Sequence, residues 1–291
     1  MGIKQSLSLI SGQCYLLPSD DDSNEILKFL NRAKGKNIVA VQGLGFVGTV
    51  MSLVVANSDA KEYAVIGVDQ ASESSYWKIG DINNGVVPIV SSDPLVRDYF
   101  LETKKRNNFL ATHDTKAFAY ADVIIVDINL DVTKVKDEDN NIKSYDVPLE
   151  GFKAAIRSIG QVCKSDVLIL VETTVPPGAC QYIVYPIIKE ELLLRGLPTE
   201  QFNLGHSYER VMPGPNYINS IKNFYRVYSG IDTKSANAVE DFLKTVISTD
   251  EYPLTRLKTT ESTEMAKVLE NSYRAMNISF SIIIFKFIPT A

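Results

Sequence analysis

Residues 37–69 read NIVAVQGLGFVGTVMSLVVANSDAKEYAVIGVD, and this stretch decides the fold. It holds an apolar run at 37–42, a glycine-containing turn, a segment of helical composition at 46–57 and a second apolar run at 63–68. Runs rich in Val and Ile on both faces are typical of strands that lie buried between two layers of helices. The order strand, helix, strand therefore predicts a parallel βαβ unit.

The turn GLGFVG at 43–48 has the spacing of a dinucleotide-binding loop, because it follows one strand and opens a helix. Gly43 permits the tight turn, Gly45 lets the backbone approach a pyrophosphate, and Gly48 lets the helix pack closely on the strand. The helix N-terminus stabilises the pyrophosphate charge. A tight turn without a ligand is the alternative interpretation of this spacing. The loop residues expected to bind the cofactor are Gly43, Gly45, Phe46, Val47 and Gly48.

Asp69 ends the second apolar run, where a carboxylate can accept hydrogen bonds from the adenosine ribose. The same carboxylate would repel a 2′-phosphate, which favours NAD over NADP. We therefore predict NAD as the cofactor. FAD binds to similar loops, but the motifs farther along the chain point away from it.

The rest of the chain continues the alternation of strands and helices. Strands are expected at 123–128, 167–171, 202–205 and 226–229, and helices at 24–34, 93–106, 151–162, 180–195, 235–247 and 260–280. This order predicts an α/β fold of the Rossmann type, with a doubly wound and mostly parallel sheet. We expect three parts: an N-terminal extension at 1–36, an NAD-binding domain at 37–258, and the start of a long central helix at 259–291.

Composition excludes several classes of protein. Of the 291 residues 45% are apolar and 22% charged, as in ordinary soluble proteins, and the net charge of −5 disfavours nucleic acid as a partner. The late apolar run at 278–289 contains a lysine and is too short to cross a membrane. Cys14, Cys163 and Cys180 show no CxxC spacing, so we expect structural thiols that stay reduced in the cytoplasm.

Several segments, in order along the chain, resemble the UDP-glucose/GDP-mannose dehydrogenase family. Its members oxidise the C6 hydroxyl of a nucleotide sugar to a carboxylate with NAD. The resemblance lies in the glycine loop, VIGVD at 65–69, INNG through PI at 82–89, TTVPPG at 173–178, SYERVMPG at 207–214, and the helix residues 264–271. It implies an NAD-dependent dehydrogenase that acts on a UDP-sugar in surface polysaccharide biosynthesis.

By this resemblance Thr174 lies near the nicotinamide and helps to hold the catalytic water, and Glu172 is a candidate nicotinamide contact. A loop that is merely stiffened by two prolines is the alternative. Glu209 matches a family glutamate that contacts substrate and water, so it could act as a general base. Arg210 beside it is a second candidate substrate contact. A solvated ion pair of these two side chains is the alternative.

The late helix supplies the third group of candidates, since Glu264, Lys267, Asn271 and Arg274 recur at three- and four-residue spacing and share one face. The resemblance implies that Lys267 stabilises the alkoxide formed during hydride transfer, and that Asn271 hydrogen-bonds to the reacting oxygen or water. Both would then contact substrate. A solvated polar stripe on an ordinary helix is the alternative.

The sequence also departs from the family pattern. The family's nucleophilic cysteine lies in a Gly-rich segment beyond this helix, and no such segment follows here. We therefore expect a truncated chain that binds NAD but has little or no dehydrogenase activity, with the apolar helix end as a homodimer contact. A non-catalytic NAD-binding remnant or subunit is the main alternative, and a β-hydroxyacid dehydrogenase is another. By the same resemblance, SYERVMPG at 207–214 looks closer to the family branch that acts on UDP-N-acetylhexosamines than to the UDP-glucose branch.

Overall fold

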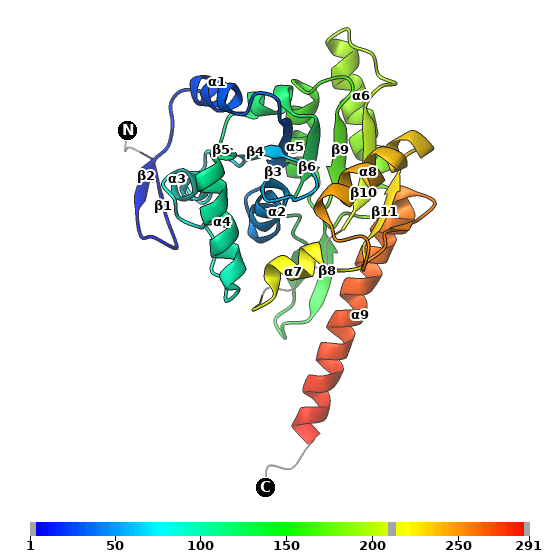
Figure 1. Ribbon diagram of the computed structural model, residues 1–291. Helices are drawn as coiled ribbons and strands as arrows, with labels where there is room; N and C mark the ends of the chain where they lie inside the picture. Colours follow the sequence, from blue (N-terminus) through cyan, green and yellow to red (C-terminus); the bar gives the residue numbers. More distant parts are fainter. Residues whose placement is uncertain (1–3, 209–213, 288–291) are drawn as a thin grey trace.

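An eight-stranded sheet forms the centre of the protein, in the order β12-β11-β10-β9-β6-β3-β4-β5 (Figure 1). The computed structural model describes residues 4–208 and 214–287, except for the side chains of residues 286 and 287. Neighbouring strands are parallel except for β10 and β11, which are antiparallel. The strands are β3 (Asn37–Gln42), β4 (Tyr63–Val68), β5 (Phe109–Thr112), β6 (Val123–Val126), β9 (Leu168–Val171), β10 (Asn203–Ser207), β11 (Val227–Gly230) and β12 (Thr255–Arg256).

Helices cover both faces of this sheet, which confirms the doubly wound, mostly parallel fold. The alternation along β3 shows the two layers: Val39 and Val41 belong to one core, and Ile38 and Ala40 belong to the other. The first core is closed by α2 (Phe46–Ala56), α3 (Tyr76–Asn83), α4 (Pro94–Arg106), α7 (Tyr217–Lys222) and α8 (Thr233–Val246). The second is closed by α1 (Ser23–Arg32), η1 (Thr115–Tyr120), α5 (Glu150–Gly160), η2 (Cys180–Val184) and α6 (Tyr185–Leu194).

The helix expected at 180–195 is divided in two. Residues Cys180–Val184 form a π-helical turn, and the α-helix α6 begins only at Tyr185. Pro186 lies in the first turn of α6, where its missing N–H is tolerated but cannot continue the bonding pattern of the preceding turn. The division of the helix into two pieces therefore has a local cause.

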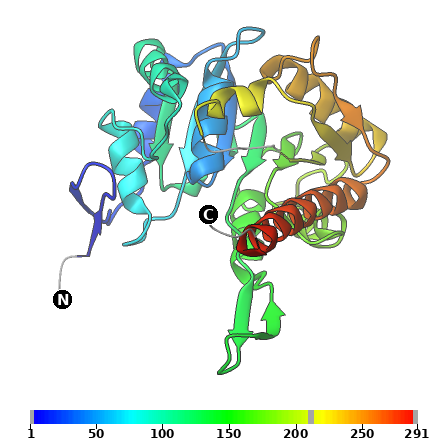
Figure 2. The ribbon, with the colours of Figure 1, turned by 90° about the horizontal axis from the view of Figure 1, so that it is seen from below.

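Two antiparallel hairpins lie outside the central sheet, and the sequence patterns did not reveal them. One pairs β1 (Gln5–Leu7) with β2 (Cys14–Leu16), and the other pairs β7 (Thr133–Lys136) with β8 (Ile142–Asp146). Figure 2 shows the second hairpin projecting from the body of the molecule.

Within the expected extension at 1–36, α1 contributes Ile26 and Phe29 to the second core, so this part packs on the sheet. The boundaries at 36 and 258 remain proposals.

The long helix α9 (Thr260–Phe287) has two environments. Its first turns pack against β10, β11 and η2, whereas residues 271–285 are exposed and extend away from the body (Figure 1). Among the described residues, no helix has both the length and the apolar character that a membrane crossing requires.

Candidate functional site

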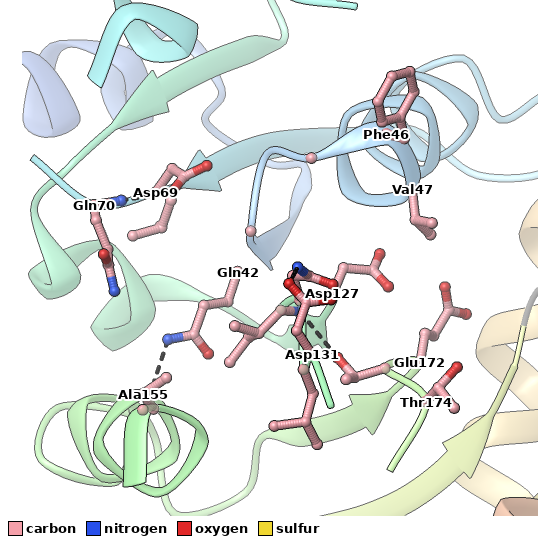
Figure 3. A pocket seen from close by; sticks show the side chains of 18 of the residues that line it. Gln42, Phe46, Val47, Asp69, Gln70, Asp127, Asp131, Ala155, Glu172 and Thr174 are labelled. Carbon is pink, nitrogen blue, oxygen red and sulfur yellow. Dashed lines mark hydrogen bonds between the residues drawn. The ribbon is translucent and has the colours of Figure 1, made fainter. Parts of the chain in front are cut away.

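A large cavity lies at the carboxyl ends of the parallel strands, where ligands bind in open α/β sheets. Its volume is about 1420 Å³. The lining comes from the turn after β3, from Asp69 after β4, from Asp127 after β6, and from Thr173 and Thr174 after β9 (Figure 3). The candidates from the glycine turn and the candidates from the turn after β9 therefore share one cavity.

The glycine turn has the geometry that its spacing predicts. Gly43 has φ +100°, and a Cβ there would lie 2.3 Å from the Asp127 carbonyl oxygen. A Cβ on Gly48 would lie 1.9 Å from the Gly43 carbonyl oxygen, so α2 can start this close to the turn only without a side chain. At Gly45 a Cβ would meet nothing within 4 Å. Gly43 and Gly48 thus form the turn, and Gly45 leaves room for a ligand.

Asp69 lies at the cavity and has defined partners. Its Oδ2 accepts a hydrogen bond from the Leu44 backbone N–H at 3.0 Å and forms an ion pair with Lys78 Nζ at 2.8 Å. Its Oδ1 accepts from the Gln70 backbone N–H at 2.7 Å. The carboxylate is therefore fixed beside the glycine turn. The sequence did not point to Lys78, although a cation on the helix after Asp69 was the available signal.

The edge after β9 is joined to its neighbour β6 by Thr173. Its hydroxyl donates to the Val126 carbonyl at 3.1 Å and accepts from the Ile128 N–H at 2.9 Å. Thr173 is buried, whereas Thr174 is exposed and lines the cavity. The position of Thr174 fits the role that the resemblance implied, and Thr173 supports the turn that carries it.

Glu172 is almost fully buried at the same edge, and its Oε1 accepts from Arg226 Nη1 at 2.6 Å. The side chains of this pair are 0% and 3% exposed. Removing one partner of such a pair would leave an uncompensated buried charge. Figure 3 shows Glu172 beside Thr174 at the cavity. The sequence did not identify Arg226 as its partner.

The loop after Thr174 is held by α9. Glu264 is fully buried, and it accepts hydrogen bonds from the backbone N–H groups of Gly178 at 2.5 Å and Cys180 at 2.8 Å. Gly178 lies just before the π-helical turn η2 and Cys180 begins it, and both N–H groups would otherwise be buried without a partner. Glu264 therefore connects the turn after β9 to α9.

The next residues on the same face of α9 approach the site. Lys267 is 8% exposed, and its Nζ lies 5.0 Å from the centroid of the Tyr208 ring, within cation–π range. Asn271, one turn later, lines the cavity, and Arg274 is exposed. A solvated polar stripe does not describe the first half of this face, because Glu264 and Lys267 are buried, whereas Asn271 and Arg274 are exposed.

Three further polar residues belong to β10 and the segment that follows it. Glu209 and Arg210 lie outside the described residues. His206 on β10 is fully buried, and burial lowers the pKa of its imidazole to about 3, with a smaller contribution from the nearby Lys267 charge. The imidazole is therefore neutral at physiological pH. His206 was not among the predicted site residues, since a buried histidine on a strand has no motif.

The cysteines lie away from the cavity lining. Cys163 and Cys180 are buried, and burial raises the pKa of both thiols, that of Cys163 to about 11. Both fit the expected structural role. Cys14 is exposed on β2 and does not.

Comparison with known proteins agrees with this geometry. Residues 37–247 match the model of the UDP-glucose/GDP-mannose dehydrogenase family, NAD binding domain. The UDP-N-acetyl-D-mannosamine dehydrogenase of Pyrococcus horikoshii is 27% identical over 243 residues, which are 84% of this chain and 52% of that protein. The UDP-N-acetyl-D-glucosamine 6-dehydrogenase of Pseudomonas aeruginosa is 28% identical over 83% of this chain and 50% of its own length.

Solved structures give the same result for the fold. The NDP-N-acetyl-D-galactosaminuronic acid dehydrogenase from Methanosarcina mazei superposes with a TM-score of 0.71 at 24% identity, over 86% of this chain and 50% of that one. The GDP-mannose dehydrogenase from Pseudomonas aeruginosa gives a TM-score of 0.65 at 25% identity, over 83% and 51%. The chain spans about half the length of the curated relatives it matches.

Proposed function

Because this chain belongs to the UDP-glucose/GDP-mannose dehydrogenase family, we propose that it binds NAD for oxidation of the C6 hydroxyl of a UDP-sugar to the uronic acid. One observation carries the proposal: the glycine turn, Asp69, Thr174 and Asn271 all line a single cavity. Cofactor-binding and substrate-binding candidates from distant parts of the sequence therefore face the same space.

The cofactor end of the cavity fits NAD, which accepts the hydride. Helix α2 begins directly after Gly45, beside the open space at that residue, so the N–H groups of its first turn are suited to a pyrophosphate. We assign Phe46 and Val47 to the same contact, since both line the cavity. Asp69 is placed for the adenosine ribose. Glu172 and Thr174 are the proposed contacts near the nicotinamide.

At the substrate end we assign the charge-stabilising role to Lys267. A buried ammonium directed at a forming alkoxide stabilises it by about 3–4 kcal/mol, the scale measured for oxyanion-hole donors. Asn271 would hydrogen-bond to the same oxygen, and Thr174 would hold a water. We keep Glu209 as the general base of the hydrolytic step and Arg210 as a substrate contact, on the strength of the motif alone.

We propose a UDP-N-acetylhexosamine as the substrate, with UDP-glucose as the alternative, in surface polysaccharide biosynthesis. The names of the relatives from Pyrococcus horikoshii and Pseudomonas aeruginosa support the first choice, as does SYERVMPG at 207–214. We further propose a homodimer in the cytoplasm. The large apolar side chains exposed on α9, which a partner would cover, include Leu269, Tyr273, Met276, Phe280 and Phe285.

A second candidate function is NAD binding without turnover. It is favoured by the cysteines, because none of them is among the described residues that line the cavity and two of the three are buried. The family's aldehyde step uses a thiol nucleophile, so a chain with no thiol at its site would have little dehydrogenase activity. A β-hydroxyacid dehydrogenase, the other expectation, has no comparable support.

The two candidates separate in a calorimetric titration with NAD, followed by UDP-N-acetylhexosamines and UDP-glucose in its presence. Binding of NAD and then of a UDP-sugar, with NADH formed on mixing, is the result expected of the dehydrogenase. Lys267→Met is the matched variant, expected to lower turnover more than binding. NAD binding with no response to any UDP-sugar would favour the second candidate, and a chain that binds no NAD would refute both.

A further inference from the structure

The β1–β2 hairpin lies before the region that matches the family model, and it packs on α3 (Figure 1). Asp81 on α3 is the centre of this contact. Its carboxylate is fully buried and accepts three hydroxyl hydrogen bonds, from Ser8 at 2.6 Å, Ser11 at 2.8 Å and Tyr15 at 2.7 Å. A buried charge is tolerated when donors of this kind satisfy it.

A close approach of backbone and ring adds to the contact. A Cβ on Gly80 would lie 2.4 Å from Cδ1 of Tyr15, so the tyrosine ring rests directly on the helix backbone. Nearby, the Ser6 hydroxyl donates to the Glu73 carbonyl at 2.8 Å and accepts from the Trp77 backbone N–H at 3.0 Å. The hairpin thus fixes both the entry to α3 and its last turns.

The same helix reaches the cofactor cavity through Lys78. This side chain lines the cavity together with Asp69, and its Nζ lies 2.8 Å from Asp69 Oδ2. Asp69 Oδ2 in turn accepts from the Leu44 N–H inside the glycine turn at 3.0 Å. A continuous series of contacts therefore runs from the hairpin through α3 to the cofactor loop.

We propose that the β1–β2 hairpin is a positioning element for the adenosine end of the dinucleotide site, with Asp81 as its positioning residue. By fixing the axis and rotation of α3, Asp81 holds the Lys78 ammonium against Asp69 and so keeps the Asp69 carboxylate oriented toward the ribose. The proposal rests on NAD binding and is independent of the sugar oxidation.

The test is the binding of two halves of the cofactor, ADP-ribose and nicotinamide mononucleotide, to the full chain and to Asp81→Ala. The variant should bind ADP-ribose about fivefold more weakly, the scale of one ordinary hydrogen bond, and nicotinamide mononucleotide with unchanged affinity. Trp77 is the single tryptophan, so its fluorescence reports on α3 in the same samples. Asp59→Ala is the matched control, because Asp59 pairs with Lys222 elsewhere.

A merely structural hairpin would behave differently. It would lower the unfolding midpoint of Asp81→Ala but leave the ADP-ribose affinity of the folded protein unchanged, and that result would overturn the proposal. The double variant with Lys78→Met sharpens the test: if Asp81 acts through Lys78, the second substitution should add little to the first. Full additivity of the two losses would also overturn the proposal.

If Asp81→Ala does not fold, variants that each remove one hydrogen-bond donor to Asp81 test the same proposal. Ser11→Ala and Tyr15→Phe each remove one donor and should weaken ADP-ribose binding in the same direction, by about twofold each. Unchanged affinity in both would count against the proposal. Failure of the unmodified chain to bind ADP-ribose would refute the dinucleotide site itself, whereas binding without sugar oxidation would affect only the function proposed above.

Discussion

Two turns at the same edge of the sheet, one after β3 and one after β9, are built in opposite ways. The turn at 43–48 is shaped by missing side chains, since Gly43 and Gly48 leave space for each other and for Asp127. The turn at 173–178 is shaped by added side chains, with Thr173 joined to β6 and the loop N–H groups of Gly178 and Cys180 held by Glu264.

The difference matters for what each turn tolerates. The first depends on its own glycines and on Asp69 and Asp127, which follow the neighbouring strands β4 and β6, and these contacts do not involve α9. The second depends on Glu264, which is 86 residues from Gly178 in the chain. Damage to α9 should therefore disturb the second turn and leave the first intact. The following experiments test this contrast, in order of decreasing effect on stability.

Glu264→Ala should have the largest effect. It leaves two buried N–H donors without a partner, at about 1–3 kcal/mol each, so we expect a loss of about 4 kcal/mol in the free energy of unfolding. Urea denaturation measures this loss. Glu261→Ala, one turn earlier on the same helix and only half-buried, is the control and should change little. Equal, small losses in both variants would show that the second turn does not need α9.

Lowering the pH should have the second largest effect on stability. It acts through His206 on β10, which pairs with Val171 on β9, the strand that leads into the second turn. The pKa of its imidazole is about 3 in the folded protein and 6.5 when unperturbed, so between these values only the unfolded chain takes up the proton. The contribution of the neutral His206 imidazole to the free energy of unfolding is therefore complete above about pH 6.5, and it is lost as the pH falls toward 3.

At pH 4.5 the histidine should cost about 2–3 kcal/mol relative to pH 7. Urea denaturation of the protein and of His206→Asn at both pH values isolates this contribution, because the variant lacks the titrating group. The variant should lose less stability on acidification than the unmodified protein. Identical losses in the two proteins would show that His206 is not held neutral by its surroundings.

Gly48→Ala tests the first turn, where the new Cβ would lie 1.9 Å from the Gly43 carbonyl oxygen. We expect a loss of about 2 kcal/mol, typical of overpacking, together with loss of NAD binding as the turn shifts. The change should stay local, so reactivity of the buried Cys180 thiol toward a thiol reagent should not rise. Increased labelling of Cys180 would indicate that the two turns are coupled.

Gly45→Ala should have the smallest effect on stability, below about 0.5 kcal/mol, because its backbone is extended and its Cβ would meet nothing within 4 Å. Its effect on NAD should nevertheless be large, since that open space is where the pyrophosphate is expected. Calorimetry on Gly45→Ala and Gly48→Ala separates the two roles. Unchanged NAD affinity in Gly45→Ala would contradict the assigned position of the pyrophosphate.

The same contrast explains what the sequence could predict. Strands β3 and β4 begin and end at the predicted residues, because an apolar run bounded by a glycine motif and an aspartate is a local signal. The Glu172–Arg226 pair was missed because its partners are 54 residues apart and meet only in the folded arrangement. The Lys78–Asp69 pair spans nine residues, but the spacing alone does not say which way Lys78 points from its helix. The two hairpins were missed because short strands with exposed faces lack the alternation that indicates a strand.

The site candidates also divide into residues that a motif located and residues whose orientation depends on the fold. Asp69, Thr174 and Asn271, which the motifs singled out, line one cavity, and their roles at it stay predictions. Spacing alone could not tell that Glu264 would face the backbone of a loop while Asn271 faces the cavity, although both lie on one helix face. Glu264 lies in the buried first turns of α9, whereas Asn271 lies where the exposed part of the helix begins.

The β7–β8 hairpin offers a practical use. Its strands are exposed throughout, yet Lys134 at its base lines the cofactor cavity. At its tip Asp137 accepts hydrogen bonds from the N–H groups of Asp139 and Asn141, so the turn holds its own shape. A fluorescent dye attached there would sit on a self-contained arm whose base lines the cavity, and could serve as an optical sensor for dinucleotide without altering the core.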